Sequence, residues 1–564
     1  MEVKRRQNQV CAVLAGLFLS AVGFTQTSPA QFVVVAPANA NNFYPAGSGN
    51  GIALRSFSLQ TTESSLKAES PGLKVSRKYS RLNSLVVEAT VEQLERAQHL
   101  GIISSFEPNV FYKNFDFSGV PTPSDQSLSP WLGEILGLDE IDASEDLTAS
   151  GNDVIVAVID TGAAHTHEYL STALAINSAE LSGTANVDDD NNGYIDDVYG
   201  GNSITKNGNI SEVGTDHGTH VSGLVKAVRD QASVNFSQAR NVKILPIRFI
   251  DSSGAGSTVG ALDAIDYAIR RGSKVINASW GAGGEGAFSQ ALYNAMVQAY
   301  ETYDIISLVA AGNAEGAQAN NNDTYPYFPA SFRIPGQITV SSVTPQFSFS
   351  GIGANTILSR IVFSDFSNYG ANSVQIAAPG SYRNAYFEEY GVYSANAAFS
   401  GNTNLFVRKK GTSMAAPVVA GIAGVIRAIN PSLTAYETRK VILETATASD
   451  ITNNRVSSGA IANAAAAFAR AQTEITTGEN PAASGAAYEI YSETDTSSSG
   501  GERAPASQPS GGCGFASSLE THDSNGDGPF GGNSILLFST LYAVFALLHS
   551  GKFRRLCRRL VKLR

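Results

Sequence analysis

The sequence contains very little cysteine, and this shortage limits the chemistry that the chain can perform. Only three cysteines occur in 564 residues, Cys11, Cys513 and Cys557, and all three lie outside the long central region. That region therefore has no disulfide framework, no thiolate zinc site and no cysteine nucleophile. Catalysis there would have to use hydroxyl groups, carboxylates, histidine or a hard metal ion.

Charged residues are also scarce, and positive charge is scarcer than negative charge. Charged residues make up 16% of the chain against 43% for hydrophobic residues, which excludes wholesale disorder. The net charge is −11, although seven of the 39 basic residues lie in the last 14 positions. So acidic a body argues against nucleic acid as a partner, because phosphate binding needs a basic surface.

The N-terminus has the order of a secretory signal peptide. Residues 1–30 contain three basic residues at positions 4–6, an apolar stretch and then the small residues Ser28 and Ala30. A second cut point at residues 38–40 stays open. We therefore expect an exported protein of the bacterial type, either secreted or held at the cell surface or envelope.

The C-terminus has the composition of a stalk, a membrane segment and a basic tail. Residues 472–534 are rich in Ser, Gly and Pro and are predicted to be a linker. Residues 535–550 are apolar, though short for a bilayer that needs about 20 residues. Residues 551–564 would form a cytoplasmic tail. The pattern resembles bacterial sorting tails that a sorting protease trims; a plain membrane anchor is the alternative.

The central region alternates short apolar runs with helical periods. A run such as 154–159, bounded by Asp and Gly, predicts a strand buried on both faces. This alternation predicts an α/β fold, with a doubly wound, mostly parallel sheet and helices on both faces. Ligands bind beyond the carboxyl ends of the strands in such sheets. The further predicted strands are 242–250, 274–277, 305–311, 338–343 and 374–378, and the predicted helices are 221–228, 259–270, 289–303 and 412–430.

Four polar residues stand where predicted strands end or helices begin. Asp160 ends the first strand, His217 opens a helix, Asn313 follows another strand, and Ser413 opens the longest helix. Each residue alone has an ordinary structural explanation, such as a turn or a helix cap. Together they supply a nucleophile at a helix N-terminus, a base, an orienting carboxylate and an amide donor.

These residues lie in motifs that resemble those of the subtilisin-like serine proteases, the subtilase family. The motifs are Asp-Thr-Gly at 160–162, His-Gly-Thr-His at 217–220 and Gly-Thr-Ser-Met-Ala-x-Pro at 411–417. The resemblance implies a serine endopeptidase that cleaves polypeptides. Ser413 would attack the scissile carbonyl, His217 would transfer its proton and Asp160 would orient His217, while Asn313 and the Ser413 amide would bind the oxyanion. A non-catalytic scaffold that binds peptides is the alternative.

The resemblance also implies two walls of a substrate cleft. One wall, Ser279-Trp280-Gly281, resembles an edge strand that pairs with extended substrate. The other wall is Ala310-Ala311-Gly312. Neither segment contains an acidic residue, which favours apolar substrate side chains, although Glu285 lies near enough in sequence to leave this open.

Residues 31–120, with a core at about 59–114, resemble the subtilase propeptide and precede the predicted catalytic domain at 121–471. A strand at 84–88, a helix at 91–99 and a strand at 102–112 with a turn at Pro108 predict a small α/β domain. The resemblance implies a zymogen whose own propeptide acts as chaperone and inhibitor, released between 115 and 130. A permanent N-terminal domain is the alternative.

An acidic insertion between Asp160 and His217 predicts a structural calcium site. Oxygen-bearing side chains alternate around Gly193, an arrangement that suits Ca²⁺. The loop is not a standard EF-hand, because its twelfth position is Tyr199 and not Glu. A solvated acidic turn is the alternative. The predicted ligands are Asp188, Asp190, Asn192, Tyr194, Asp196 and Asp197.

Overall fold

The computed structural model describes residues 30–36, 59–114, 151–212, 214–314, 320–349, 356–383, 389–397, 406–483 and 485–490. These residues belong to one compact unit. The predicted signal peptide before Ala30, the release region, the linker beyond residue 490, the membrane segment and the basic tail all lie outside the described residues.

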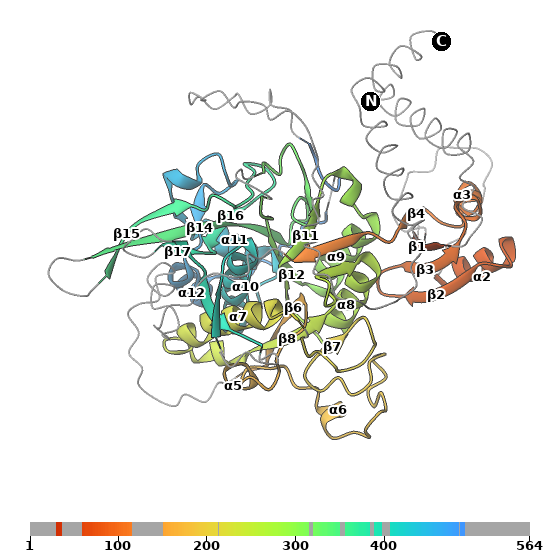
Figure 1. Cartoon of the computed structure of the whole chain (residues 1–564), viewed down its shortest axis with the longest axis horizontal. Coiled ribbons are helices and arrows are strands. Elements are labelled where there is room, and N and C mark those ends of the chain that lie inside the picture. The colour runs from red at the N-terminus through yellow and green to blue at the C-terminus, as the bar shows by residue number, and fades with distance from the viewer. Residues whose placement is uncertain are drawn as a thin grey trace, which may run out of the picture. The chain divides into compact units, whose positions relative to one another are not determined.

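A large, mostly parallel sheet forms the centre of this unit (Figure 1). Its first strand, β6 (Val154–Asp160), lies between β8 (Val242–Arg248) and β10 (Val275–Ala278). The chain adds β8 on one side of β6 and later strands on the other, so the winding reverses between β6 and β10. This topology confirms the predicted doubly wound α/β fold and places ligand binding at the carboxyl ends of β6 and β10.

The remaining strands extend the sheet on both sides. Strand β14 (Gln337–Phe349) continues past the predicted end at Val343. Its second half pairs with an antiparallel strand that the sequence did not predict, β15 (Thr356–Phe363). The order across the sheet is β21 (Thr447–Ala448), β22 (Ala460–Ile461), β16 (Ile376–Pro379), β14 (Gln337–Phe349), β12 (Ile306–Ala310), β10, β6, β8 and β7 (Gly201–Asn202), with β15 (Thr356–Phe363), β17 (Tyr382–Arg383) and β18 (Glu389–Tyr390) beside β14. A separate hairpin joins β19 (Val392–Ala395) to β20 (Phe406–Lys409).

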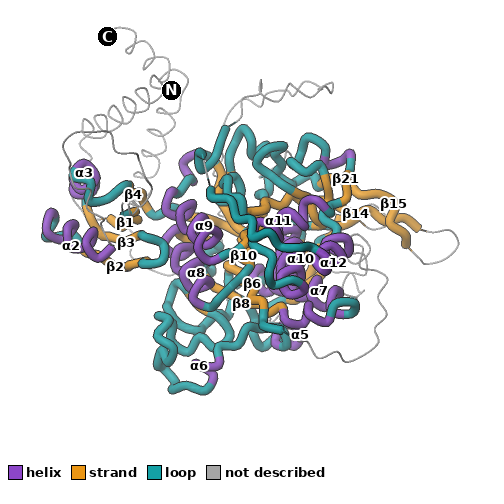
Figure 2. The backbone as a smooth tube through the Cα atoms, turned by 180° about the vertical axis from the view of Figure 1, so that it is seen from behind, coloured by secondary structure: helices purple, strands orange, loops and turns teal. Residues whose placement is uncertain are grey.

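The helices cover both faces of the sheet. Seen from behind, α8 (Thr258–Arg270) and α9 (Gln290–Tyr303) lie on one side of β6, β8 and β10, and α7, α10, α11 and α12 lie on the other (Figure 2). The bounds of the second group are α7 (His217–Ser233), α10 (Thr412–Ile429), α11 (Ala435–Glu444) and α12 (Ala464–Thr473), and two short helices are α5 (Glu168–Ser171) and α6 (Ser178–Leu181).

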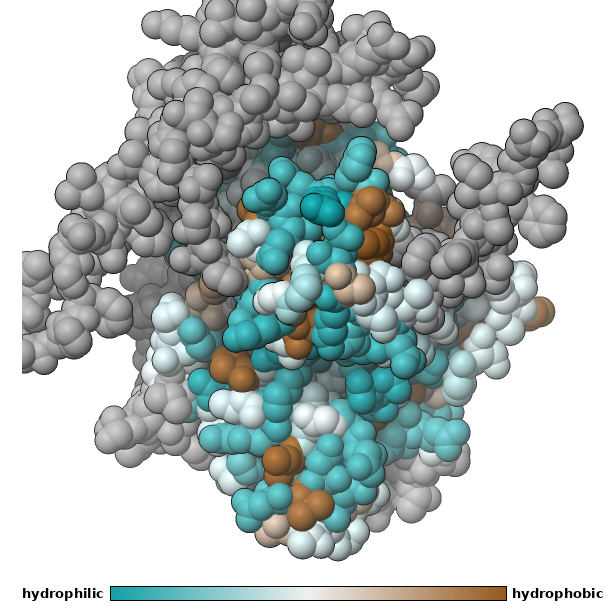
Figure 3. Space-filling model, turned by 90° about the vertical axis from the view of Figure 1, so that its right-hand side faces the viewer, coloured by the Kyte–Doolittle hydropathy of each residue, from teal (hydrophilic) through white to brown (hydrophobic). Residues whose placement is uncertain are grey.

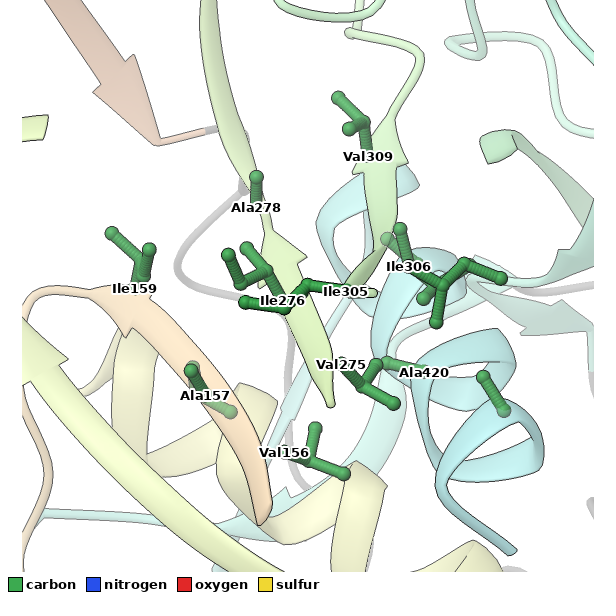
Figure 4. Packing of buried hydrophobic residues seen from close by; sticks show 14 of the residues in the cluster. Val156, Ala157, Ile159, Val275, Ile276, Ala278, Ile305, Ile306, Val309 and Ala420 are labelled. Atoms are coloured by element: carbon green, nitrogen blue, oxygen red, sulfur yellow. The ribbon is translucent and has the colours of Figure 1, made fainter. Parts of the chain in front are cut away.

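Helix α10 is the centre of the core. It is apolar on all sides and almost wholly buried, as a helix enclosed by protein should be. Its glycines allow close approach, because a Cβ on Gly424 would lie 2.8 Å from Val156 and one on Gly421 would lie 2.7 Å from Val228. Figure 4 shows Ala420 of α10 beside the apolar side chains of β6, β10 and β12. Among the described residues, α10 is also the one helix long and apolar enough to cross a membrane, but its burial explains that composition.

The N-terminal part folds as a four-stranded antiparallel sheet with two helices. One of its two interior strands, β1 (Ala30–Val35), was missed in the sequence, because it lies between the predicted signal peptide and the predicted core at 59–114. The sheet order is β2-β3-β1-β4, and the elements are α2 (Leu59–Glu69), β2 (Lys74–Tyr79), β3 (Ser84–Ala89), α3 (Val91–His99), β4 (Ser105–Pro108) and the separate strand β5 (Phe111–Asn114).

This N-terminal part caps two helices of the central region. The Glu107 carboxylate accepts hydrogen bonds from the amides of Gln290 at 2.8 Å and Ala291 at 3.2 Å, at the start of α9. Asn109 Oδ1 accepts from the amide of Val259 at 3.0 Å, at the start of α8. Acceptors at these positions satisfy amides that have no partner within the helix.

Ion pairs join the same two parts. Arg77 of β2 pairs with Asp263 of α8, and Arg81 Nη1 lies 3.7 Å from Asp266 Oδ1. Both aspartates are buried. Buried carboxylates require partners of opposite charge, so these contacts bind the N-terminal part to the outer surface of α8.

The predicted linker begins later than residue 472. Helix α12 continues to Thr473, and the segment after it lies along the central region. Glu437 accepts hydrogen bonds from Thr476 Oγ1 at 2.7 Å and from the Thr477 amide at 2.6 Å. Tyr488 packs against Phe328, with ring centroids 4.8 Å apart. The polar composition indicated a stalk, but these contacts hold the described residues 474–483 and 485–490 against the domain.

The surface drawn in Figure 3 is mostly hydrophilic, with apolar side chains in separated spots. Exposed apolar residues are normal on globular proteins when they are scattered in this way. Several belong to the acidic insertion and its surroundings: Ile176, Leu181, Val187, Ile195 and Ile204.

Candidate active site

The carboxyl end of β6 brings Asp160 to the start of α7. Asp160 Oδ1 lies 2.7 Å from His217 Nδ1, and both side chains are fully buried. The Thr161 amide also donates to Asp160 Oδ1 at 2.7 Å. A carboxylate in this position fixes the orientation of the imidazole and directs Nε2 to the other side of the ring.

Ser413, the candidate nucleophile, lies in the first turn of α10. Its Oγ donates to the Ser279 carbonyl at 2.9 Å, and Ser279 Oγ donates back to the Ser413 carbonyl at 2.9 Å. The second bond is possible because residue 417 is proline, which lacks the N–H that would otherwise bond that carbonyl within the helix. Ser413 is thus held to the loop that follows β10.

Asn313 follows β12 and lies against the same helix start. Its Oδ1 accepts from the Thr412 amide at 3.0 Å and from Thr412 Oγ1 at 2.9 Å. Because a backbone amide can only donate, these bonds identify the oxygen of the carboxamide and direct its NH₂ group away from Thr412. The structure thus brings the Asn313 donor to the helix end that carries Ser413.

The first predicted substrate wall is a strand, β11 (Trp280–Gly283), between β13 (Tyr327–Phe328) and β5. β5 lies antiparallel to it, with Lys113 opposite Gly281, and β9 (Ala255–Ser257) lies on the other side of β5. The end of the N-terminal part therefore occupies the position that an added peptide strand would take.

The Trp280 side chain of this wall belongs to the hydrophobic core. Trp280 is buried, and its Nε1 donates to the Ile159 carbonyl at 2.8 Å. Its ring lies 5.3 Å from the ring of Tyr112 on β5. The Trp280 side chain is therefore part of the core, and its ring also contacts β5 through Tyr112.

The second predicted wall continues β12. Ala310 and Ala311 are fully buried, and the Gly312 amide donates to Thr412 Oγ1 at 3.1 Å. Gly312 has a φ of 102°, a conformation that favours glycine. The structure places this segment beside the start of α10, with its two alanine side chains buried in the core, and its role as a substrate wall stays a prediction.

The acidic insertion gathers a different set of residues from the predicted one. Carboxylate oxygens of Glu180, Asp190 and Asp197 lie within 4.8 Å of one another. Asn192 Nδ2 donates to Asp190 at 3.1 Å and to Asp197 at 3.0 Å, so it borders the cluster. Glu180, which the sequence did not single out, replaces several predicted ligands.

Three predicted ligands have side chains that make other contacts. Asp188 accepts from the amides of Asn192 and Gly193, and Asp196 accepts from the amide of Asn186, so both carboxylates stabilise turns. The Tyr194 side chain is buried, with its hydroxyl donating to the Asp263 carbonyl. Spacing around Gly193 could not reveal these orientations, because left-handed residues at Asn191 and Asp196 redirect the loop.

The remaining cluster fits a metal ion. Burial raises the pKa of Glu180, and the nearby charges of Asp197 and Asp190 add to the effect. Arg271 Nη1 pairs with Asp197 at 3.1 Å and balances part of the negative charge. An all-oxygen donor set with residual negative charge is one that a hard cation can occupy.

A family model for the subtilase family matches residues 151–474. The chain belongs to the subtilase family. This family of serine proteases includes subtilisin DY of Bacillus licheniformis, to which the subtilase described here is 31% identical over 53% of its own length and 85% of the relative's. Subtilisin-like protease 1 of Plasmodium vivax is 28% identical over 53% of this chain and 45% of that protein. The chain thus spans about half the length of the first curated relatives that it matches.

Solved subtilase structures share the fold. Fervidolysin from Fervidobacterium pennivorans, a keratinolytic enzyme, aligns with a TM-score of 0.52 and 20% identity, over 80% of this chain and 62% of that one. The epidermin leader peptide processing protease of Staphylococcus aureus aligns with a TM-score of 0.51 and 18% identity, over 80% of this chain and 100% of that one.

Sequence reasoning missed two residues next to the candidate triad residues of this subtilase. Thr412 orients Asn313, and its place beside Ser413 was the signal that could have identified it. Glu212 lies at the start of α7, where its carboxylate accepts from the Gly218 amide at 2.9 Å. The sequence offered no sign of Glu212, because its neighbours come from β6 and α7 together.

Proposed function

We propose that this protein is an exported serine endopeptidase, made as a zymogen, with Ser413, His217 and Asp160 as its catalytic triad. The observation that carries the proposal is the buried 2.7 Å contact between His217 Nδ1 and Asp160 Oδ1, at the sheet edge where α10 presents Ser413. This arrangement suits nucleophilic attack by a hydroxyl with an imidazole as base.

In the proposed reaction, the Ser413 hydroxyl leaves the Ser279 carbonyl and gives its proton to His217 Nε2 while Oγ attacks the substrate carbonyl carbon. Asp160 stabilises the imidazolium that forms. The oxyanion accepts hydrogen bonds from Asn313 Nδ2 and the Ser413 amide. His217 then returns the proton to the leaving amine, and water releases the acyl group by the same steps.

Residues 30–114 act as the propeptide in this proposal. β5 adds to β11 as a substrate strand would, and the helix caps and ion pairs on α8 and α9 extend the contact. This arrangement also favours signal-peptide removal near Ala30 over removal at residues 38–40. A cut at the later position would delete β1, which pairs with β3 and β4.

The bound cation is proposed to be calcium. Glu180, Asp190 and Asp197 would hold it, with the carboxamide of Asn192 beside them. Calcium would supply charge compensation for the acidic insertion and take no part in peptide hydrolysis. The C-terminal segment 535–550 with its basic tail would attach the enzyme to a membrane or to a sorting protease, which accords with an exported enzyme.

A covalent probe tests the central proposal. A fluorophosphonate should label the purified, processed protein at Ser413, and phenylmethylsulfonyl fluoride should block both labelling and peptide hydrolysis. Peptide mapping identifies the labelled residue. Absence of labelling in a folded, processed protein would support the alternative of a non-catalytic scaffold.

A further inference from the structure

Glu212 connects the start of α7 to the triad carboxylate. Its Oε1 accepts from the Gly218 amide at 2.9 Å and its Oε2 accepts from the Thr219 amide at 3.2 Å. The N-cap residue of α7, Asp216, makes no side-chain cap bond. Glu212 therefore supplies the negative charge that a helix N-terminus favours, immediately beside His217.

One hydroxyl joins this carboxylate to Asp160. Thr161 Oγ1 contacts Glu212 Oε1 and lies 3.2 Å from Asp160 Oδ1. The Gly218 amide donates to Thr161 Oγ1 at 2.8 Å, which holds the hydroxyl between the two acids. Asp160 Oδ2 has no hydrogen-bond partner among the described residues, so Oδ1 alone receives the donors recorded for Asp160.

A threonine hydroxyl has one proton to donate. When Glu212 is ionised, the hydroxyl donates to Glu212, and Asp160 loses that donor while a second negative charge stands nearby. When Glu212 is protonated, its own O–H donates to Thr161 Oγ1, and the threonine proton turns to Asp160. The first state favours the imidazolium of His217 and the second disfavours it.

We propose that Glu212 is a positioning residue that sets the basicity of the Asp160–His217 pair through the Thr161 hydroxyl. The inference rests on the proposed serine-protease function and deepens it by naming a regulator of the same site.

The surrounding charges allow Glu212 to change protonation near neutral pH. Burial raises the pKa of Glu212 to about 7, against the hydrogen bonds from Thr161 and Thr219, which lower it, and with the carboxylates of Asp160 and Asp216, which raise it. Asp216 is itself paired with Lys409 of β20 at 2.7 Å. From β8, the Arg248 guanidinium donates to the Ser211 carbonyl at 2.6 Å, so a positive charge also lies beside this segment.

The main test is Glu212→Gln. The amide can still accept from α7 and donate to Thr161, so it imitates the protonated state. We expect the acid limb of kcat/KM to move down by about 0.5–1 pH unit relative to the wild type, whose limb reflects two coupled groups. Glu444→Gln, at an exposed site on α11, is the matched control and should leave the limb in place.

Substitutions of Thr161 test the connection itself. Thr161→Val removes the hydroxyl, so Asp160 lacks this donor in both protonation states of Glu212, and the acid limb should move up, opposite to Glu212→Gln. In the double variant, Glu212→Gln should lower the limb less than it does in the wild type, because no hydroxyl connects residue 212 to Asp160. Thr161→Ser should restore the wild-type limb. If Glu212→Gln fails to fold, the upward shift in the Val variant and its reversal in the Ser variant carry the comparison. Unchanged limbs in folded Glu212→Gln and Thr161→Val, with altered melting temperature only, would show that Glu212 is merely a helix cap.

A second readout does not require activity. In the full chain carrying Ser413→Ala, the His217 imidazole pKa, followed by NMR, should fall by a similar amount on adding Glu212→Gln. An inactive, unlabelled wild type together with this shift would overturn the proposed function and keep the Glu212 inference. An active wild type without this pKa shift would keep the proposed function and overturn the Glu212 inference.

Discussion

The N-termini of α7 and α10 bring His217 and Ser413 to the same edge of the sheet, yet they treat negative charge differently. At α7 the Glu212 carboxylate accepts from two amides. At α10 the first turn has no acidic residue, Gly411 makes no side-chain cap, and the neutral carboxamide of Asn313 accepts from Thr412. A titratable carboxylate at the start of α7 can both cap the helix that carries His217 and respond to pH. The uncharged start of α10 leaves the positive end of its helix dipole free to stabilise negative charge that forms during a reaction.

Removing the nucleophile from α10 should have the largest effect. Ser413→Ala deletes the hydroxyl but leaves the helix start intact, so we expect kcat to fall by a factor on the order of 10⁶ while the fold is kept. Hydrolysis of a chromogenic peptide and circular dichroism measure the two properties. If self-processing releases the propeptide, the variant should also retain residues 30–114. Hydrolysis at the parental rate would contradict the role of Ser413.

Removing the oxyanion donor at the same helix start should have the next largest effect. Asn313→Ala should lower kcat about 10²–10³-fold with little change in KM, because the lost bond forms only in the transition state. Steady-state kinetics measure the split. Asn294→Ala, on the outer part of α9, is the matched control. A rise in KM with an unchanged kcat would mean that Asn313 binds substrate in its ground state.

The carboxylate cluster of the acidic insertion is formed by residues other than those at the starts of α7 and α10. We therefore expect metal binding there to affect stability and not catalysis. Removing calcium with a chelator should lower the melting temperature by about 5 °C, if the ion is present at about 100 times its dissociation constant. Asp190→Asn should reduce this calcium dependence, whereas Asp188→Asn, outside the cluster, should retain most of it. Calorimetry measures the shift. Equal melting with calcium and with chelator would favour the solvated acidic turn.

The smallest effect is expected at Thr412. Thr412→Val removes one of the two donors that orient Asn313 and keeps the backbone amide. A single hydrogen bond of this kind contributes about 1 kcal/mol, so kcat should fall about fivefold. The pH dependence should not move, because α10 has no titrating cap, in contrast with Glu212→Gln at α7. A shifted acid limb in Thr412→Val would remove the distinction between the two helices.

Continuous patterns made much of this molecule predictable. The apolar run before Asp160 and the helix predicted at 259–270 agree with β6 and α8 within one residue. The triad candidates could be named because each stands within a contiguous motif at a strand or helix end. Glu180 and Glu212 could not be named, because their partners come from other elements, and a side chain's direction is set by the folded loop. Strand β1 was missed because its short apolar run directly follows the predicted signal peptide and lies far in sequence from its partners β3 and β4.

The caps that Glu107 and Asn109 place on α9 and α8 have a consequence for folding kinetics. Both acceptors lie about 150 residues or more before the helices that they cap. The chain must close very long loops before these contacts stabilise the helix starts, and such contacts slow folding. If residues 30–114 are removed, as proposed, each lost cap costs about 1 kcal/mol and can no longer be supplied by the same chain. The processed domain would then persist through a slow unfolding rate, and a denatured sample should refold faster when residues 30–114 are added back.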